Sequence, residues 1–325
     1  MDTASIGSPA LWAGFIGFVL VMLGLDLGLF HRKAHVVSLK EALGWSVVWV
    51  VLAGLFATGL WWFHGSDRAL EFTAGFVIEK ALAVDNLFVF AVVFSTFAVP
   101  VVQQHRVLFW GIIGALVMRA TFIFAGSALL SHFHWTMYVF GGVLVLTGLK
   151  LLFQKEATPD PEKSFAVRWL RKLLPVAPAS SNGTFFERRQ GALFITPLFL
   201  ALVTVEVTDL IFAVDSIPAI FAVTSDPFIV FTSNIFAILG LRSLYFVLAD
   251  LISRFSLLKY GLAVVLLFVG AKMLLMGVVK IPIVASLLVI VSILGVSVLL
   301  SILKKPRVGS ELDAGRLGQA DRRPT

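Results

Sequence analysis

Long apolar runs recur along the whole 325-residue chain, and each is long enough to cross the hydrocarbon core of a bilayer as a helix. The chain is 59% hydrophobic and only 14% charged, with a mean hydropathy of +0.97, a composition far from that of soluble domains. We therefore predict an all-α polytopic membrane protein that contacts the lipid bilayer along most of its length. We place about nine membrane-spanning helices, at residues 10–30, 43–63, 69–97, 107–130, 135–153, 196–222, 228–250, 257–278 and 281–303.

The distribution of Lys and Arg predicts the orientation of these spans. Basic residues gather in the loops after odd-numbered spans and in the C-terminal tail, whereas the loops after even-numbered spans contain only Arg68 and Lys280. Because cytoplasmic loops carry the excess of Lys and Arg, we expect an outside N-terminus and a cytoplasmic C-terminus. The net charge of +7 is then a topology signal, and we expect no nucleic acid as a partner.

The predicted organisation is one transmembrane domain over residues 1–304 and a polar cytoplasmic tail over 305–325 that we expect to be disordered. Residues 154–190 form the one long cytoplasmic loop. Its middle, residues 165–174, has basic and apolar residues at helical spacing and predicts a short amphipathic helix on the inner leaflet. A surface linker and a partner-binding or regulatory segment are both compatible with this pattern.

Three carboxylates, Glu206, Asp209 and Asp215, interrupt the sixth apolar run. An ionised carboxylate at the bilayer centre costs about 2.5–3.5 kcal/mol on insertion scales, so such groups face protein, water or an ion. Glu206 and Asp209 share a helix face, but Asp215 points elsewhere on one continuous helix. Either the three acids have different partners, or the helix opens near Pro218, whose nitrogen cannot donate to the carbonyl of Val214.

An internal repeat relates the third to fifth spans to the sixth to eighth spans. The paired charged positions are Glu79 and Asp209, Asp85 and Asp215, Arg119 and Arg242, and Lys150 and Lys272. The first two pairs are each 130 residues apart, and the later pairs are 123 and 122 residues apart. Each copy has three helices, so the second copy must enter the membrane from the opposite side. We predict an inverted repeat, with copies at about residues 69–153 and 196–278, around a site near the bilayer midplane.

The polar residues inside these spans form an oxygen-rich set, which consists of Glu79, Asp85, Asn86, Glu206, Asp209, Asp215 and Ser216. The chain has no cysteine, and its six histidines all fall at span ends, so these oxygens suit a hard cation such as Mn²⁺, Mg²⁺, Ca²⁺ or Na⁺. We predict a cation site, with no resident cofactor. The alternative is that the acids are buried ion-pair partners of Lys80, Arg119 and Arg242. Both interpretations hold if these bases balance the charge when no cation is bound, and Asp26 fits either the interface or the site.

The sequence resembles the TerC family of bacterial membrane proteins, including its Alx branch. Residues 25–35 and 38–42 resemble the family's N-terminal segment, and residues 79–90 and 206–219 are similar to its two acidic motifs. The resemblance covers about residues 10–303. It implies a multi-span fold with repeats akin to those of LysE-type exporters, a place in the bacterial inner membrane, and a role in metal-ion homeostasis described as Mn²⁺ export. The family takes its name from tellurium resistance, which these residues do not explain.

The combined expectation is a transporter that exports a divalent metal cation, most specifically Mn²⁺, in exchange for protons. Carboxylates that share one cavity repel each other, so at least one would hold a proton until metal binding releases it. We expect Asp85 and Asp215 to lie close together near the midplane, and Asp215 is the candidate for the alternating group. The sequence leaves the oligomeric state open.

Two other functional classes are alternatives to transport. A membrane scaffold of a metal or tellurite stress-response complex would have no need of carboxylates at mid-membrane depth. An intramembrane enzyme is not expected, because the sequence contains no His-Glu-x-x-His pair and no evident nucleophile with a base partner.

Overall fold

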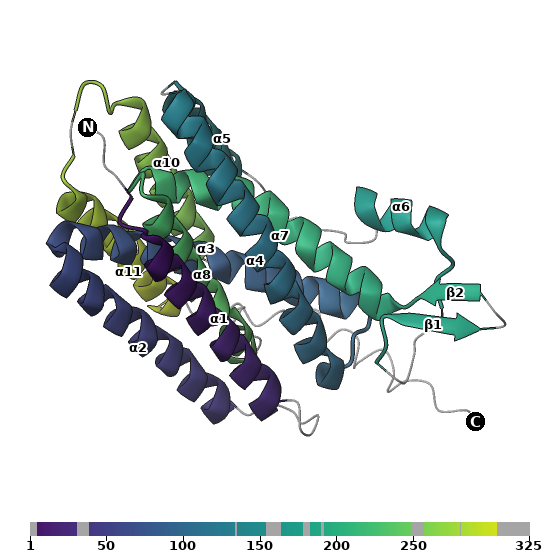
Figure 1. Cartoon of the computed structure of the whole chain (residues 1–325). Coiled ribbons are helices and arrows are strands. Elements are labelled where there is room, and N and C mark those ends of the chain that lie inside the picture. The colour runs from purple at the N-terminus through teal and green to yellow at the C-terminus, as the bar shows by residue number, and fades with distance from the viewer. Residues whose placement is uncertain are drawn as a thin grey trace.

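Long helices account for nearly all of the described chain, as the cartoon in Figure 1 shows. The structure, a computed structural model, describes residues 5–30, 39–133, 135–153, 164–177, 183–189, 192–248, 257–279 and 281–303. The predicted tail over 305–325 and the first part of the predicted loop, 154–163, lie outside these ranges. The helices are α1 (Pro9–Phe30), α2 (Leu39–His64), α3 (Ser66–Thr96), α4 (Val101–His132), α5 (Thr136–Phe153), α6 (Phe165–Leu173), α7 (Pro197–Phe221), α8 (Pro227–Leu239), α9 (Leu241–Leu248), α10 (Leu258–Leu274) and α11 (Ile283–Leu303).

Five helices of the described chain are long and apolar enough to cross a membrane on length and composition alone. They are α2, α4, α5, α7 and α11. Helix α3 is long enough to cross a membrane but carries charged residues. Helices α8 and α10 are shorter than the five, with 13 and 17 residues. The fold is therefore that of a multi-span helical membrane protein, and the full count of about nine spans stays a prediction.

Helix α7 runs unbroken through the acidic stretch. It extends from Pro197 to Phe221 with Pro218 inside its last turn, so the second alternative, an opening near Pro218, does not occur. The proline lies so close to the C-terminal end that few hydrogen bonds remain for it to disrupt. Asp209 and Asp215 have different partners, Arg119 and Thr147, as the first alternative requires of these two acids.

The seventh predicted span is two helices, a correction to the sequence analysis. Helix α8 ends at Leu239, and α9 begins at Leu241 after Gly240. The Nζ atom of Lys80 donates a hydrogen bond of 3.1 Å to the carbonyl of Ala237, in the last turn of α8. A cation at the carbonyl end of a helix is favourable, and a side chain at position 240 would collide with Lys80.

A short β-hairpin is the one departure from the predicted all-α class among the described residues. Strands β1 (Phe186–Arg189) and β2 (Ala192–Ile195) pair antiparallel immediately before α7. The predicted amphipathic helix is present as α6. The segment after α6 pairs with β2, since the amide of Ala177 donates to the carbonyl of Ile195 over 2.8 Å. The hairpin thus ties α6 to the start of α7.

The centre of the bundle is formed by α3, α4, α7 and α8. Helix α3 contacts α7 and α8, and α4 contacts the same two helices. Helices α5 and α10 pack against each other beside this group, at two points where glycine permits close approach. A Cβ on Gly148 would lie 2.9 Å from the carbonyl oxygen of Ala263, and a Cβ on Gly270 would lie 2.9 Å from that of Gly141. These glycines let the two backbones meet.

One end of the bundle is closed by a polar network around Asp226. The carboxylate of Asp226 accepts hydrogen bonds from the Ser5 hydroxyl at 2.7 Å and from the Ile6 amide at 2.8 Å. It also caps α8 through the amide of Phe228, and Arg68 lies 3.9 Å away. The N-terminal segment, the α2–α3 turn and the α7–α8 turn therefore lie at the same end, as the predicted topology requires of loops on one side.

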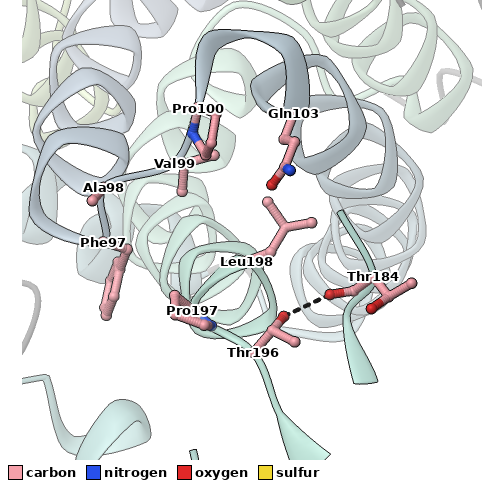
Figure 2. Close-up of a pocket in the computed structure, with 9 residues that line it drawn as sticks. All are labelled: Phe97, Ala98, Val99, Pro100, Gln103, Thr184, Thr196, Pro197 and Leu198. Carbon is pink, nitrogen blue, oxygen red and sulfur yellow. Dashed lines mark hydrogen bonds between the residues drawn. The ribbon is translucent and has the colours of Figure 1, made fainter. Parts of the chain in front are cut away.

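The opposite end joins the α3–α4 turn to the hairpin. Figure 2 shows a small pocket here, lined by residues of the α3–α4 turn and of the start of α7. Arg106 donates to the carbonyl of Gly183 at 2.6 Å, and the Thr196 hydroxyl donates to the carbonyl of Thr184 at 2.7 Å. Thr196 also caps α7 through the amide of Phe199. These contacts hold the loop before α7 against the bundle end.

Candidate functional site

Arg119 is the centre of a buried charge cluster in the middle of the bundle. Its guanidinium forms ion pairs with Glu79 of α3 and with Asp209 of α7. Two hydrogen bonds reach the Asp209 carboxylate, from Nη2 at 2.9 Å and from Nε at 3.2 Å. Arg119 and Glu79 are each 1% exposed, and Asp209 is 4% exposed. Such burial is sustainable only because the charges are paired.

Two amides complete the cluster. Asn234 of α8 accepts a hydrogen bond of 3.1 Å from Nη1 of Arg119 through its Oδ1. Asn86 of α3 donates a longer bond of 3.3 Å to Oδ1 of Asp209. Glu79 and Asn86 are seven residues apart, so they share one face of α3. The cluster therefore joins all four central helices.

Several polar atoms in and near the cluster have no hydrogen-bond partner among the described residues, although they are buried. They are Oε2 of Glu79, Oδ1 of Asn86, Nδ2 of Asn234, Oε2 of Glu206 and Oγ of Ser216. A buried polar atom without a partner costs about 1–3 kcal/mol, so each is expected to have a function or a further ligand. Four of the five are oxygen atoms that can bind a cation.

Glu206 lies one helical turn before Asp209, and its carboxylate occupies the space above Gly114 of α4. A Cβ at position 114 would overlap both carboxylate oxygens of Glu206. The Asp209 carboxylate acts on Glu206 through like-charge repulsion. With Arg119 counted, the formal charges of Glu79, Glu206 and Asp209 leave two negative charges uncompensated if all three acids are ionised.

Asp215 faces away from this cluster. Its Oδ1 accepts a hydrogen bond of 2.8 Å from the Thr147 hydroxyl of α5, and the Lys150 ammonium attracts it electrostatically. Asp215 is half-buried, whereas its neighbour Ser216 is 2% exposed. The geometry of α7 thus separates Asp215 from Asp209, as their six-residue spacing requires.

Some of the remaining predicted site residues have side chains outside the described part of the structure, and others have partners that differ from those expected. The side chains of Asp26, Asp85 and Arg242 lie outside the described part of the structure, so the expected proximity of Asp85 and Asp215 stays a prediction. Lys80, predicted to balance charge, donates to the carbonyl of Ala237 at the end of α8, and it forms no ion pair with an acid among the described residues. Within the described ranges, no group of three His, Cys, Asp or Glu side chains has the geometry of a metal site. Arg119 takes up the positions between Glu79 and Asp209.

Sequence reasoning missed three residues that the geometry makes important. Asn234 is an amide in an apolar run, and an amide there is equally typical of ordinary hydrogen bonding between helices. The sequence around Thr147 does not distinguish it from other threonines in the apolar runs. The same is true of Gly114 among the glycines. Their importance depends on which side chain lies opposite, and a single sequence does not contain that information.

The fold and the buried cluster define an integral membrane protein with paired charges at its centre. A family model described as "Integral membrane protein TerC family" matches residues 64–308. The chain belongs to the TerC family.

Full-length relatives agree with this assignment. The chain is 56% identical over 300 residues to the "Uncharacterized membrane protein STKORF319" of Myxococcus xanthus, covering 92% of this chain and 94% of that protein. It is 50% identical over 299 residues to the "Putative membrane-bound redox modulator Alx" of Escherichia coli strain K12, covering 89% and 93%. The protein of the same name from Salmonella typhi is 49% identical over 306 residues, covering 91% and 95%. No solved structure matches the chain.

Proposed function

We propose that this protein exports a divalent metal cation, most specifically Mn²⁺, across the bacterial inner membrane in exchange for protons. The observation that carries the proposal is the acidic cluster at the centre of the bundle, whose buried carboxylate and amide oxygens include some with no partner in the described part of the chain. Oxygen ligands of this kind suit hard divalent cations. A scaffold needs no such oxygens in its core.

Arg119 has a specific part in this proposal. Its guanidinium holds Glu79 and Asp209 together and balances their charge when no cation is bound. A divalent cation that approaches Glu79, Glu206 and Asp209 would compensate the two charges that Arg119 leaves. The oxygens of Glu79 and Asn86 without partners supply further ligands beside it. Arg119 therefore lowers the cost of the empty site, and it leaves Oε2 of Glu79, Oδ1 of Asn86 and Oε2 of Glu206 as the oxygens available to a cation.

An inverted repeat would give this site two alternating access routes. Contacts of the central helices support the repeat, because α3 packs on α8 while α4 packs on α7. The glycine contacts of α5 and α10 also form an equivalent pair, since position 148 and position 141 lie 122 residues before positions 270 and 263. Gly148 meets the carbonyl of residue 263, and Gly270 meets that of residue 141. Two equal contacts of this kind are expected from a two-fold relation.

Proton exchange would run through an acid outside the cluster. Asp215 is half-buried on the other side of α7, bonded to Thr147 and facing Lys150. A carboxylate there can change its protonation without breaking the Arg119 ion pairs. The name of the Alx relatives refers to redox modulation. This chain has no cysteine and therefore no thiol of its own, and we propose that a redox effect here would arise through metal supply.

Metal flux in vesicles tests the proposal. The purified protein is reconstituted into proteoliposomes, and Mn²⁺ movement is followed with and without an imposed pH gradient. We expect flux that rises with the gradient and that is lost in Asp209→Asn. Ser8→Ala, a change at an exposed helix end far from the cluster, is the control and should transport normally. Wild-type vesicles that move no more Mn²⁺ than empty vesicles would refute transport and leave the scaffold as the working hypothesis.

A further inference from the structure

Helix α6 divides into three faces of different chemistry. Val167 is fully buried, and Leu170 packs beside it against the core of the bundle, so this face belongs to the protein. Phe165, Trp169 and Leu173 follow at four-residue spacing and are 77%, 55% and 56% exposed. They form one apolar stripe on a neighbouring face.

The third face of α6 is basic. Arg168 and Lys172 are exposed and four residues apart, and Arg171 extends the same side. The helix contains no acidic residue. At 100° per residue, the apolar stripe, the basic face and the face against the protein point in three different directions around the helix.

Helix α6 lies beside one end of a candidate membrane span. The helix packs against α7, a candidate span that begins at Pro197 (Figure 1). The chain after α6 is fixed by the bonds between Ala177 and Ile195 and between Ile195 and Pro175. Ile195 is followed at once by Thr196, the N-cap of α7. The apolar stripe is therefore held beside the N-terminal end of α7, where a candidate membrane span begins.

We propose that α6 is a docking surface for anionic phospholipid of the cytoplasmic leaflet. Phe165, Trp169 and Leu173 enter the acyl boundary, and Arg168 and Lys172 bind headgroup phosphates above it. Aromatic side chains at this depth and basic residues at the headgroups are the pattern of helices that lie in the interface. The segment after α6 pairs with β2, which leads directly into α7. Bound lipid therefore steadies the N-terminal end of α7, the helix that carries Glu206, Asp209 and Asp215. This inference does not depend on the transported substrate.

A single-cysteine label tests the surface, because the chain has no cysteine of its own. Full-length Trp169→Cys and Lys172→Cys are each labelled with an environment-sensitive fluorophore. Both are reconstituted in vesicles of phosphatidylcholine with and without phosphatidylglycerol. In the anionic vesicles we expect quenching of the label at position 169 by aqueous iodide to be roughly threefold weaker than at position 172.

A charge variant separates lipid binding from simple exposure. Arg168→Gln with Lys172→Gln, labelled at position 169, should lose roughly tenfold in phosphatidylglycerol affinity, because each base near an anionic surface contributes to binding. Arg168→Lys with Lys172→Arg keeps both charges and should behave like the parent, which controls for disruption of the helix. Equal quenching at positions 169 and 172 in every vesicle would overturn the docking surface. If the label at position 169 is equally protected from iodide with and without phosphatidylglycerol, the anionic selectivity is overturned. If its protection grows only with the density of protein in the vesicle, the surface contacts another copy of the chain and the lipid proposal is overturned.

Discussion

The guanidinium of Arg119 holds the carboxylate of Asp209 from 90 residues away along the chain, through two hydrogen bonds of 2.9 and 3.2 Å. The same side chain pairs with Glu79, so one base joins an acid from each of the two proposed repeats. Because both acids use Arg119, its removal affects them together.

Arg119→Ala should destabilise the protein by about 3–5 kcal/mol, because it leaves two buried carboxylates without their counter-charge. The measurement is the unfolding temperature of the purified protein in detergent. Arg119→Met combined with Glu79→Gln and Asp209→Asn removes all three charges and should recover most of the loss. An Arg119→Ala protein that unfolds like the parent would show that the cluster does not hold the helices together.

Gly114→Ala should lower Mn²⁺ flux strongly, because the added Cβ occupies the space of the Glu206 carboxylate. Adding Glu206→Asp, which shortens the acid, should restore part of the flux. Gly142→Ala is the matched control, since nothing lies within 4 Å of its Cβ position. That change should be neutral or stabilise the helix by up to about 1 kcal/mol. If both glycine variants transport equally, the position of Glu206 has no part in transport.

Asp215→Asn should leave residual Mn²⁺ flux that no longer responds to the pH gradient, because the amide resembles the permanently protonated acid. Thr147→Val removes the hydroxyl that binds Asp215 and should shift the pH dependence while keeping flux. Thr121→Val is the control, since that hydroxyl bonds only its own helix carbonyl among the described residues. Full gradient sensitivity in Asp215→Asn would assign the proton to another group.

Asp226→Ala should cost about 1–2 kcal/mol through loss of the α8 N-cap. It should also release the N-terminal segment, because Ser5 and Ile6 both donate to this carboxylate. Hydrogen exchange at the Ile6 amide measures that release. Asp226→Asn keeps an accepting oxygen and should give an intermediate effect. Unchanged exchange in the alanine variant would mean that the N-terminal segment is held by other contacts.

Reporter fusions at Pro161 and Pro306 should both give cytoplasmic signals. The distribution of Lys and Arg among the loops is the reason, and both positions lie outside the described part of the chain. A fusion at Gly65, in the turn between α2 and α3, should give the opposite signal. A periplasmic signal at either proline would reverse or break the predicted topology.

The sequence by itself determined the membrane class, most helix positions and the amphipathic α6. Apolar runs and helical spacing are local properties, and insertion into a bilayer depends on them directly. The spacing of Glu206, Asp209 and Asp215 also showed that one helix cannot direct all three to one point. The break at Gly240 and the hairpin before α7 were missed, because Lys80 and the pairing with the segment after α6 contribute from distant parts of the chain.

Only the tertiary structure decided the partners of the buried acids. The sequence offered Lys80, Arg119 and Arg242 as equivalent bases, and helix packing brought Arg119 to Glu79 and Asp209 while sending Lys80 to the end of α8. It also placed Asp215 against Thr147, away from the cluster. A periodic pattern fixes the face on which a side chain lies. The group opposite that face depends on how helices cross, which is set by contacts such as those of Gly114 and Gly148 with other helices.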